Sequence, residues 1–480
     1  MVNGLTITEV VEGIRSGKFS CSELVEEYIR KIEEDRKSEL PINAFISVCK
    51  DEAIRTARYI DDNRNKISGK IIGVPIAIKD NINVEGQPST CGSKILEGFV
   101  AVEDATVVTK IKSEGGVIIG KTNMDEFAMG SSNETSHYGV VRNPYDKSRV
   151  PGGSSGGSAA SVSADLCVAS LGSDTGGSIR QPSAFCGVVG LKPTYGLVSR
   201  YGLIAFGSSL DQIGPITKTV EDAAILLEVI AGYDPKDSTS VKVENTRFSE
   251  NLKERIDPFS VKIGIPEEYF SGDIQKEILE GIESVVKALS GKGVSVKNVS
   301  LPRTKYAIPT YYIVAPAEAS SNLARFDGVR YGFRAQAKSL NEMYRSTKTL
   351  GFGREVKRRI MLGNYVLSAG YYDAYYLKAL KVRTLLKEDF SKAFSEVDFI
   401  ITPTTPTTAF RIGEKISNPI EMYLSDIFTV TVNLVGTCAI SLPIGKDSNG
   451  LPIGMQIIAR PFHDSNLLRF AYFVEKLVLS

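Results

Sequence analysis

Two glycine- and serine-rich stretches near the middle of the sequence contain residues that could perform acyl-transfer chemistry. The first reads GGSSGGS at 152–158, and the second reads GSDTGGSIR at 172–180. A Gly-Gly pair before a serine lets the backbone approach a ligand and can direct successive N–H groups at one point, as in an oxyanion hole. The second stretch therefore offers Ser178 as a candidate nucleophile. The first could be a flexible linker, but a linker is not normally followed at once by a strand and another Gly-Gly-Ser.

A serine nucleophile needs a base within hydrogen-bond reach, and this sequence contains little histidine. His137 and His463 are the only two histidines among 480 residues. Lys79 is the alternative, because it ends the apolar run 73–78 and burial lowers the pKa of a lysine. Asp80 could have the opposite effect and keep Lys79 charged if the two pair directly. From the residues alone, a Ser/Lys hydrolase and a structural set of Gly/Ser turns both remain open.

Composition argues against several other classes of protein. Lys and Arg (57) almost balance Asp and Glu (56), and a net charge of +1 argues against strong autonomous binding to nucleic acid. Two histidines exclude a multi-histidine metal site, and six scattered cysteines without a C-x-x-C pair predict neither a zinc centre nor a disulfide framework. We find no signal peptide and no apolar stretch of about 18 residues, so we expect a cytoplasmic protein without a membrane segment.

Residues 115–122, GGVIIGKT, satisfy the phosphate-binding pattern G-x-x-x-x-G-K-[ST]. That pattern needs a strand before the first glycine and a loop between the glycines. Here the residues between the glycines have the pattern of the strand itself, and N–H groups engaged in a sheet cannot cradle phosphate. We therefore interpret the segment as a turn, a strand and a lysine at its end.

The elements that must position these residues alternate along the chain. Helical patterns are found at 5–34 (two segments), 50–64, 105–114, the start of 123–129, 157–165, 275–290 and 369–396. Strand-like runs are found at 73–78, 117–119, 167–171, 261–265, 294–299 and 398–402. This alternation predicts an α/β sheet with helices on both faces.

Domain boundaries are only weakly marked. We expect residues 1–65 to form an N-terminal helical segment packed on the core and residues 66–480 to form the main domain. The polar stretch 235–259, which contains Pro235 and Pro258, is the best candidate for a surface loop.

The sequence resembles the amidase signature family, whose hallmark is GGSSGGS leading to D-x-G-G-S-I-R. Both motifs are present, at 152–158 and 174–180, with Lys79 upstream in VPIAIKD. The resemblance implies one α/β domain with a mixed sheet of about eleven strands between helical layers. It also implies a Ser-Ser-Lys triad: Ser178 as nucleophile, Ser154 as a bridge preceded by a cis peptide from Gly153, and Lys79 as the base and later the proton source for ammonia.

The same resemblance implies how the second stretch would act. The backbone would supply an oxyanion hole at Thr175, Gly176, Gly177 and Ser178. Asp174 and Arg180 are expected to pair and to brace that turn.

Within the family, the sequence is most similar to the glutamine-hydrolysing A subunits of tRNA-dependent amidotransferases. This similarity rests on residues 121–131, 201–215, 318–328 and 355–360 and extends over nearly the whole chain. It implies a heterotrimer in which ammonia released from glutamine passes through a tunnel to a B subunit that amidates Glu-tRNA(Gln), while a small C subunit wraps around this chain. ATP and Mg²⁺ would be used in the partner subunit, which would also make most of the tRNA contacts, and no metal or cofactor is expected in this chain.

Glutamine recognition calls for an arginine opposite the α-carboxylate and a carboxylate opposite the α-ammonium. The matching positions are Arg359 (or its neighbour Arg358) and Asp426. The similarity adds Gly130, Ser131 and one of the pair Tyr311 and Tyr312. The arginines could equally form a solvated helix face and the tyrosines could belong to the core.

Two other functions remain as alternatives at this point. A free-standing amidase acting on a small amide would need neither the arginine nor the carboxylate for an amino-acid head group. A catalytically silent scaffold is the second alternative, and the complete set Lys79, Ser154 and Ser178 argues against it. We interpret His137 as a local variant and His463 as structural.

Overall fold

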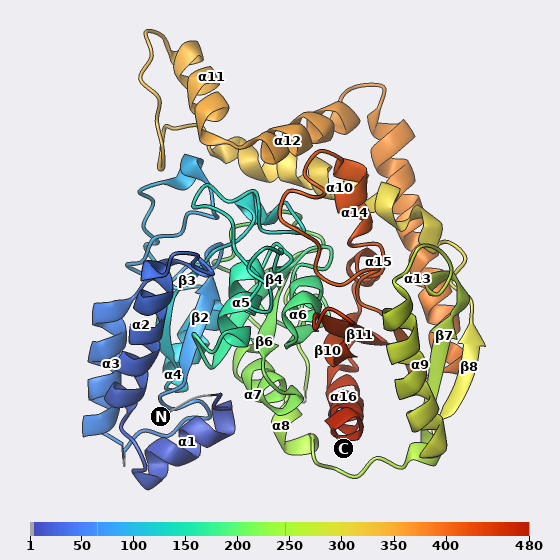
Figure 1. Cartoon of the computed structure of the whole chain (residues 1–480). Helices are drawn as coiled ribbons and strands as arrows, with labels where there is room; N and C mark the ends of the chain where they lie inside the picture. Colours follow the sequence, from blue (N-terminus) through green and yellow to red (C-terminus); the bar gives the residue numbers. More distant parts are fainter. Residues whose placement is uncertain (1–3, 65, 245, 480) are drawn as a thin grey trace.

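The computed structural model describes residues 4–64, 66–244 and 246–479. Its centre is a mixed sheet of eleven strands in the order β1-β3-β2-β4-β6-β5-β10-β11-β9-β7-β8 (Figure 1). In chain order the strands are β1 (Phe45–Val48), β2 (Pro75–Lys79), β3 (Val117–Thr122), β4 (Ala169–Asp174), β5 (Val189–Lys192), β6 (Gln212–Thr217), β7 (Lys262–Pro266), β8 (Ser295–Val299), β9 (Phe399–Pro403), β10 (Cys438–Lys446) and β11 (Pro452–Ala459). This confirms the expected α/β class and the single mixed sheet.

Sixteen α-helices of the described residues surround the sheet. They are α1 (Ile7–Ser16), α2 (Cys21–Lys37), α3 (Lys50–Asp62), α4 (Thr106–Ser113), α5 (Gly156–Ser163), α6 (Arg180–Cys186), α7 (Val220–Ile230), α8 (Phe248–Asn251), α9 (Lys276–Gly291), α10 (Ala307–Asn322), α11 (Leu340–Gly351), α12 (Arg354–Leu367), α13 (Lys378–Glu396), α14 (Pro419–Leu424), α15 (Val430–Val435) and α16 (Asp464–Leu479). In Figure 1, α12 crosses above the sheet near α10 and α14, and α11 projects from the same end.

Helices cover both faces of the sheet. Neighbouring residues of one strand accordingly belong to different hydrophobic clusters, one on each face. In β11, Ile457 belongs to one hydrophobic cluster and Ile458 to the other, and in β9 Ile401 and Ile400 divide in the same way. The first cluster includes residues of α1 to α4, α7, α9 and α16, and the second includes residues of α10, α13 and α15. Burial on two faces explains why these strands are continuous apolar runs in the sequence.

The N-terminal segment supplies an edge strand as well as helices. α1 and α2, the two helices expected within 5–34, begin with capping boxes at Thr6 and Ser20. β1 then pairs antiparallel with β3, with Phe45 opposite Thr122. The expected helical unit at 1–65 is therefore continuous with the sheet, and its residues 1–3 and 65 lie outside the described residues.

Three other segments differ in detail from the sequence-based expectation. The expected helix start at 123–129 is only a short 3₁₀ turn, η2 (Glu126–Ala128), in which Phe127 has a φ of 50°. The expected helix at 369–396 begins as a π-helical turn, η7 (Tyr372–Leu377), before α13. The segment 235–259 contains α8, whose Phe248 is buried, so this stretch is anchored to the body of the protein; residue 245 lies outside the described residues.

Among the described residues, no helix is both long and apolar enough to cross a membrane. The same part of the chain contains no group of three or more His, Cys, Asp or Glu side chains arranged to hold a metal ion.

Candidate active site

The two Gly/Ser stretches lie against each other at the centre of the sheet. The second follows β4 and leads into α6, while the first leads into α5, which packs on β4. The Ser155 N–H donates to the Ser178 carbonyl at 3.1 Å, and the Ser155 hydroxyl donates to the Ser173 carbonyl at 3.2 Å. A methyl group added at Gly172 would lie 2.9 Å from Ser155 Oγ, which explains the glycine there. The structure thus brings both stretches into one site.

Lys79 and Ser154 are in direct contact. The Lys79 ammonium donates to Ser154 Oγ at 2.8 Å and to the Ser173 carbonyl at 3.3 Å. The peptide bond from Gly153 to Ser154 is cis. Lys79 is completely buried, and this burial lowers its pKa to about 7, although Asp125, Asp174 and Asp211 oppose the shift.

Asp80 does not hold Lys79 charged. Its carboxylate lies 3.3 Å from Lys121 Nζ and accepts hydrogen bonds from the backbone and hydroxyl of Thr90. Lys121 also donates to Ser89 Oγ at 2.9 Å. Because Lys121 is buried in this polar cluster at the end of β3, the phosphate-binding pattern at 115–122 is structural, as the sequence analysis predicts.

Ser178 begins the turn into α6 with its hydroxyl unengaged. Within the described part of the chain this hydroxyl makes no hydrogen bond, and Ser178 is 8% exposed. The backbone N–H groups of Thr175, Gly176 and Ser178 are also without an acceptor among those residues, whereas the Gly177 N–H donates to Asp174 Oδ1 at 2.8 Å. The turn therefore presents a free hydroxyl together with free N–H donors. The Gly177 N–H is not one of them, because its hydrogen bond to Asp174 stabilises the turn.

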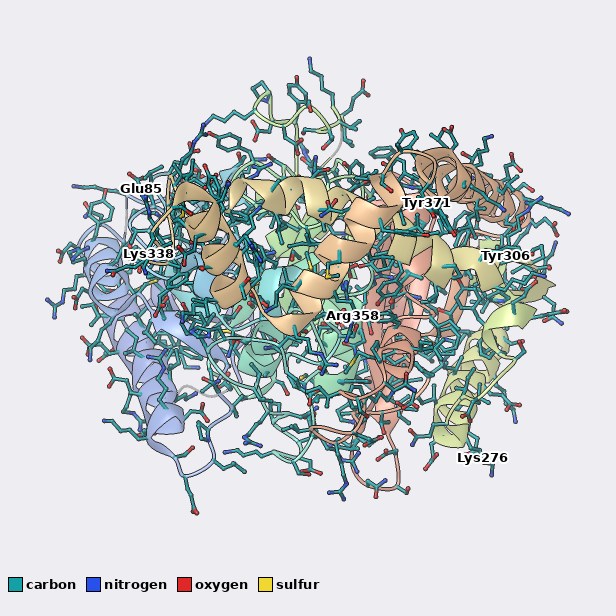
Figure 2. All side chains as sticks on the ribbon, turned by 90° about the horizontal axis from the view of Figure 1, so that it is seen from above. Glu85, Lys276, Tyr306, Lys338, Arg358 and Tyr371 are labelled. Atoms are coloured by element: carbon teal, nitrogen blue, oxygen red, sulfur yellow. The ribbon has the colours of Figure 1, made fainter. Side chains whose placement is uncertain are left out.

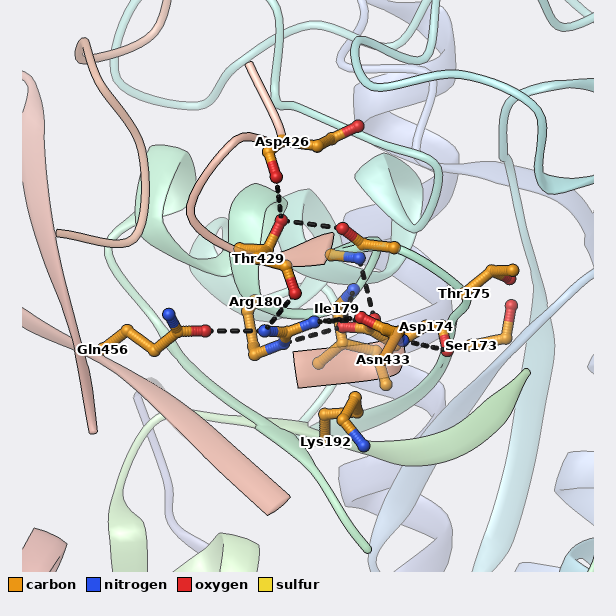
Figure 3. Close-up of polar contacts among 12 residues, drawn as sticks. Ser173, Asp174, Thr175, Ile179, Arg180, Lys192, Asp426, Thr429, Asn433 and Gln456 are labelled. Carbon is orange, nitrogen blue, oxygen red and sulfur yellow. Dashed lines mark hydrogen bonds and ion pairs between the residues drawn. The ribbon is translucent and has the colours of Figure 1, made fainter. Parts of the chain in front are cut away.

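A buried ion pair holds this turn in place (Figure 3). Arg180 contacts Asp174 through two hydrogen bonds, Nε to Oδ2 at 3.1 Å and Nη2 to Oδ1 at 3.0 Å. Burial acts to raise the pKa of Asp174, but the Arg180 guanidinium outweighs it and holds the pKa at about 2. Arg180 also donates to Gln456 at 2.6 Å and Asn433 at 2.7 Å, so its remaining donors are satisfied.

A cavity of about 410 Å³ lies between the loop that carries Gly130 and Ser131 and the start of α12. Its lining includes Gly130, Ser131, Arg358 and Arg359, together with Tyr423. Loop residues of this wall adjoin the triad, because a methyl group added at Gly153 would lie 2.9 Å from the Ser132 nitrogen. The predicted substrate-binding residues of loop 130–131 and of α12 therefore line one cavity next to Ser154.

Arg359, and not Arg358, is the buried member of the arginine pair. Arg359 is 3% exposed; its Nε donates to Glu355 at 2.9 Å, and its guanidinium lies over the ring of Tyr312 at 5.2 Å. Its two Nη atoms make no hydrogen bond within the described residues and are available to a ligand. Arg358 is half-exposed and forms its ion pair with Glu355.

Asp426 has one satisfied and one unsatisfied carboxylate oxygen. Ser131 donates to Oδ2 at 2.5 Å, while Oδ1 is buried and has no partner within the described residues. Burial raises the pKa of Asp426 to about 7, although the Ser131 hydrogen bond and the nearby Arg359 oppose the shift. A bound cation would satisfy Oδ1 and restore the charge.

The two tyrosines have different neighbours. Tyr311 packs on the turn of the second stretch, since a methyl group at Gly176 would lie 2.7 Å from its Cζ. Tyr312 stacks on Tyr423 with ring centroids 3.8 Å apart and lies under Arg359. Tyr311 is therefore the one nearer to Ser178.

Sequence reasoning missed three side chains that hold the turn. Thr429 donates its hydroxyl to the Gly176 carbonyl at 2.7 Å, and Asn433 and Gln456 both contact the Asp174–Arg180 pair or its backbone (Figure 3). Each is a polar residue inside an otherwise apolar segment, which signals a buried hydrogen-bonding role but not its partner. The two histidines, His137 and His463, are exposed and contact none of these groups.

Comparison with known proteins identifies the family of this chain. Residues 23–468 match the Amidase family, and the chain belongs to that family. The A subunit of glutamyl-tRNA(Gln) amidotransferase from Koribacter versatilis is 56% identical over 477 residues, which are 99% of this chain and 98% of that protein. Its namesake from Thermodesulfovibrio yellowstonii is 55% identical over 479 residues, which are 99% and 97% of the two chains.

Solved structures of related proteins share the fold. The crystal structure of the A subunit of glutamyl-tRNA(Gln) amidotransferase from Thermotoga maritima has a TM-score of 0.80 at 47% identity and covers 98% of this chain and 94% of its own. A 6-aminohexanoate cyclic dimer hydrolase has a TM-score of 0.84 at 26% identity, covering 99% and 97%.

Proposed function

We propose that this chain is the glutamine-hydrolysing A subunit of a glutamyl-tRNA(Gln) amidotransferase. One observation carries the proposal: the Arg359 guanidinium, whose Nη atoms have no partner among the described residues, lies near the Asp426 carboxylate, which has one unpartnered oxygen. The Thr429 hydroxyl joins Asp426 to the turn that carries Ser178, because it lies 3.1 Å from the Asp426 carbonyl and 2.7 Å from the Gly176 carbonyl. These are the groups that an α-carboxylate and an α-ammonium need. Full-length relatives of that name at 55–56% identity support it.

Hydrolysis begins with attack by Ser178 on the side-chain amide of glutamine. Ser154 passes the Ser178 proton to Lys79, which is neutral in about half of the molecules at pH 7 because its pKa is about 7. The Ser178 oxygen bonds to the amide carbon, and the negative charge that develops on the carbonyl oxygen faces the free N–H groups of the turn.

Collapse of this intermediate breaks the carbon–nitrogen bond. Lys79 returns its proton through Ser154 to the departing nitrogen, which leaves as ammonia, and the glutamyl group remains as an ester on Ser178. Water, activated by the same relay, then hydrolyses the ester and releases glutamate.

The head group of glutamine is held away from the reacting atoms. Arg359 binds the α-carboxylate by donating from its two Nη atoms, and Asp426 accepts from the α-ammonium, with Ser131 orienting the Asp426 carboxylate at 2.5 Å. Tyr311 packs against Gly176 of the turn, and Gly130 leaves room for the Asp125 carboxylate beneath the loop. These contacts select an amino-acid amide over a simple amide.

The ammonia is used by partner subunits in this proposal. A B subunit would receive it, bind Glu-tRNA(Gln) and use ATP and Mg²⁺ to activate the glutamate, while a small C subunit completes a cytoplasmic heterotrimer. The relatives are each named as one subunit of an amidotransferase, which supports a multi-subunit assembly. A net charge of +1 suits a chain that leaves most tRNA contacts to its partner.

A free-standing amidase is the competing proposal. The fold does not separate the two, because the 6-aminohexanoate cyclic dimer hydrolase has a TM-score of 0.84. Its identity is 26%, against 47% for the Thermotoga maritima protein, and a simple amide would leave both Arg359 and Asp426 unsatisfied.

The Ser178→Ala variant of the assembled complex tests the proposal. It should lose glutamine-dependent amidation of Glu-tRNA(Gln) but keep amidation driven by added ammonium, because Ser178 serves only to release ammonia. Failure of ammonium to restore the product in an intact complex would contradict this division of labour. A γ-glutamyl ester trapped on Ser178 would identify the nucleophile, whereas label on Cys91 or Cys186 would move it to a thiol.

A further inference from the structure

Glu126 is a buried carboxylate at the substrate cavity to which the mechanism gives no role. It is 3% exposed and lies in η2, between β3 and the loop that carries Gly130 and Ser131. Its Oε1 accepts the Ser93 hydroxyl at 2.5 Å, and its two oxygens accept the Gly353 N–H at 3.0 and 2.9 Å. Glu126 also lines the cavity.

Gly353 is the N-cap of α12, the residue just before its first turn, so Glu126 caps a helix from a distant part of the chain. The N-cap residue of α12 is a glycine and makes no side-chain capping hydrogen bond. An acceptor oxygen at a helix N-terminus satisfies one of the N–H groups that the helix itself leaves without a partner. The approach is close, since a methyl group at Gly353 would lie 2.3 Å from Glu126 Oε2.

α12 in turn carries the groups that would hold the glutamine head. Arg359 lies six residues beyond the cap, about 9 Å along the helix. Glu355, close to the cap, accepts from Arg359 Nε at 2.9 Å and from the Tyr423 hydroxyl at 3.0 Å. Figure 2 shows the neighbouring Arg358 on this helix as it crosses the face seen from above. A shift of the helix start therefore moves the guanidinium of Arg359.

The residue before Glu126 fixes the opposite wall of the cavity. The Asp125 carboxylate accepts the Asn133 N–H at 2.8 Å and the Thr135 hydroxyl at 2.8 Å, which holds the loop that presents Ser131 to Asp426. Two adjacent carboxylates thus hold the loop on one side and α12 on the other.

We propose that Glu126 is a positioning residue that sets the distance between loop 130–131 and α12, and so places Arg359 opposite Asp426 for glutamine. The proposal rests on glutamine hydrolysis being the reaction. Glu126 acts through the Gly353 N–H and not by touching substrate, so its hydrogen-bond acceptor matters and its charge does not.

Variants of Glu126 in the full chain test this directly. Glu126→Ala removes the cap, and we expect KM for glutamine to rise about ten- to a hundredfold while turnover of a short aliphatic amide without charged groups changes little. Glu126→Gln keeps an acceptor for the Gly353 N–H and should stay close to the wild type. A Gln variant as impaired as the Ala variant would mean that the charge contacts substrate, and would overturn the positioning role.

Gly353→Ala changes the other partner of the contact between Glu126 and Gly353. Its φ of −72° suits alanine, so the substitution acts only by pushing the Glu126 carboxylate away. We expect it to raise KM for glutamine as Glu126→Ala does, and to add almost nothing in the double variant. Additive effects of the two substitutions would show that they act separately and would refute the proposal, even if Glu126→Ala alone folds poorly.

Asp222→Ala is the matched control for loss of a buried helix cap. Asp222 accepts the Ile7 N–H at 2.9 Å at the start of α1, far from the cavity in sequence and fold. It should lower thermal stability without changing KM for glutamine. An equal rise in KM in this control would show that Glu126 acts only through general stability, whereas a wild-type complex inactive on glutamine would contradict the proposed function itself.

Discussion

Lys79 illustrates how burial alone can convert a lysine into a base. An exposed lysine has a pKa of about 10.4 and is almost fully protonated at neutral pH. In this protein the pKa is lowered to about 7, chiefly by burial and against the pull of three carboxylates. Because Asp80 is engaged by Lys121 and Thr90, no carboxylate pairs directly with Lys79 among the described residues and cancels the effect.

The pH dependence of glutaminase activity should follow this group. Activity requires the neutral amine, which forms as pH rises, so kcat/KM should increase with pH through about 7 and then level off. Lys79→Ala should remove this rise of kcat/KM with pH together with most of the activity. Lys79→Arg should not restore activity, because a guanidinium does not release its proton. An active Arg variant would place the base elsewhere, and His137 would then be the next residue to replace.

Arg359 should control affinity for the amino-acid head group. Losing a charge-assisted pair costs about 1.5–3 kcal/mol, so Arg359→Ala should raise KM for glutamine roughly ten- to a hundredfold. Turnover of an amide without a carboxylate should be much less affected. Arg358→Ala is the control, because this side chain is half-exposed and already engaged by Glu355. Comparable losses on both amides would assign Arg359 a structural role.

At the scale of elements, the turn between β4 and α6 depends on segments far away in sequence. Asp174 and Arg180 belong to the turn, but the groups that complete their hydrogen bonds lie on α15 and β11. A buried ion pair gains stability only if its remaining hydrogen-bonding capacity is satisfied. Asn433 and Gln456 satisfy it here.

Asp174→Asn should therefore be strongly destabilising, since it leaves the Arg180 charge buried without its counter-ion. The free energy of unfolding, measured with urea, should fall by about 3–5 kcal/mol. Asp146→Asn is the comparison, because its pair with Arg149 is partly exposed and is worth less than about 1 kcal/mol.

The decrease in the free energy of unfolding at low pH should depend on the same Asp174–Arg180 pair. The pKa of Asp174 is about 2 in the folded protein, below its unfolded value of about 3.9, so the pair's contribution is complete above about pH 4 and is lost as pH falls toward 2. The Asn variant should lack that component. An unchanged decrease at low pH would show that another carboxylate governs it.

Local patterns predicted many of these elements but not all of them. Short apolar runs indicated β2, β3, β4, β7, β8 and β9, and helical periodicity with capping residues indicated α1 to α5 and α9. The strands β1, β5, β6, β10 and β11 were not predicted: β1 has only four residues, and the other four contain glycine or proline, which interrupts the apolar run. The helix start expected at 123–129 failed because Asp125 and Glu126 use their carboxylates for tertiary contacts.

Part of the candidate site could likewise be predicted from the sequence, and part could not. The sequence motifs and their spacing were sufficient to propose Ser154, Ser178 and Lys79. The choice of Arg359 over Arg358 needed the burial of each side chain, which depends on how α12 packs on α10. The contact between Glu126 and Gly353 spans 227 residues, and no local pattern indicates it.

At the scale of the whole molecule, the sheet is joined through its C-terminal hairpin. β10 and β11 stand between β5 on one side and β9 on the other, so they connect the half of the sheet built from β1 to β6 with the half built from β7 to β9. Among the strands of the described residues, all pairing between the two halves of the sheet passes through β10 and β11.

Truncation after Gly436 should therefore destroy solubility. It removes β10, β11 and α16 and leaves β5 and β9 with unpaired edges, which are templates for aggregation. Deletion of residues 1–16 removes α1 but no strand, and should leave the protein soluble with lowered thermal stability. Soluble yield and light scattering measure both outcomes, and a soluble truncated chain with native circular dichroism would contradict the expectation.

The same topology governs the order of events during synthesis on the ribosome. The chain emerges from its N-terminus, so β7, β8 and β9 are made well before β11 exists to receive them. Until residue 459 has left the exit tunnel, the nascent chain must carry two separate apolar assemblies with open edges. The whole sheet can therefore form only after β11 has emerged, and until then those edges are open to aggregation.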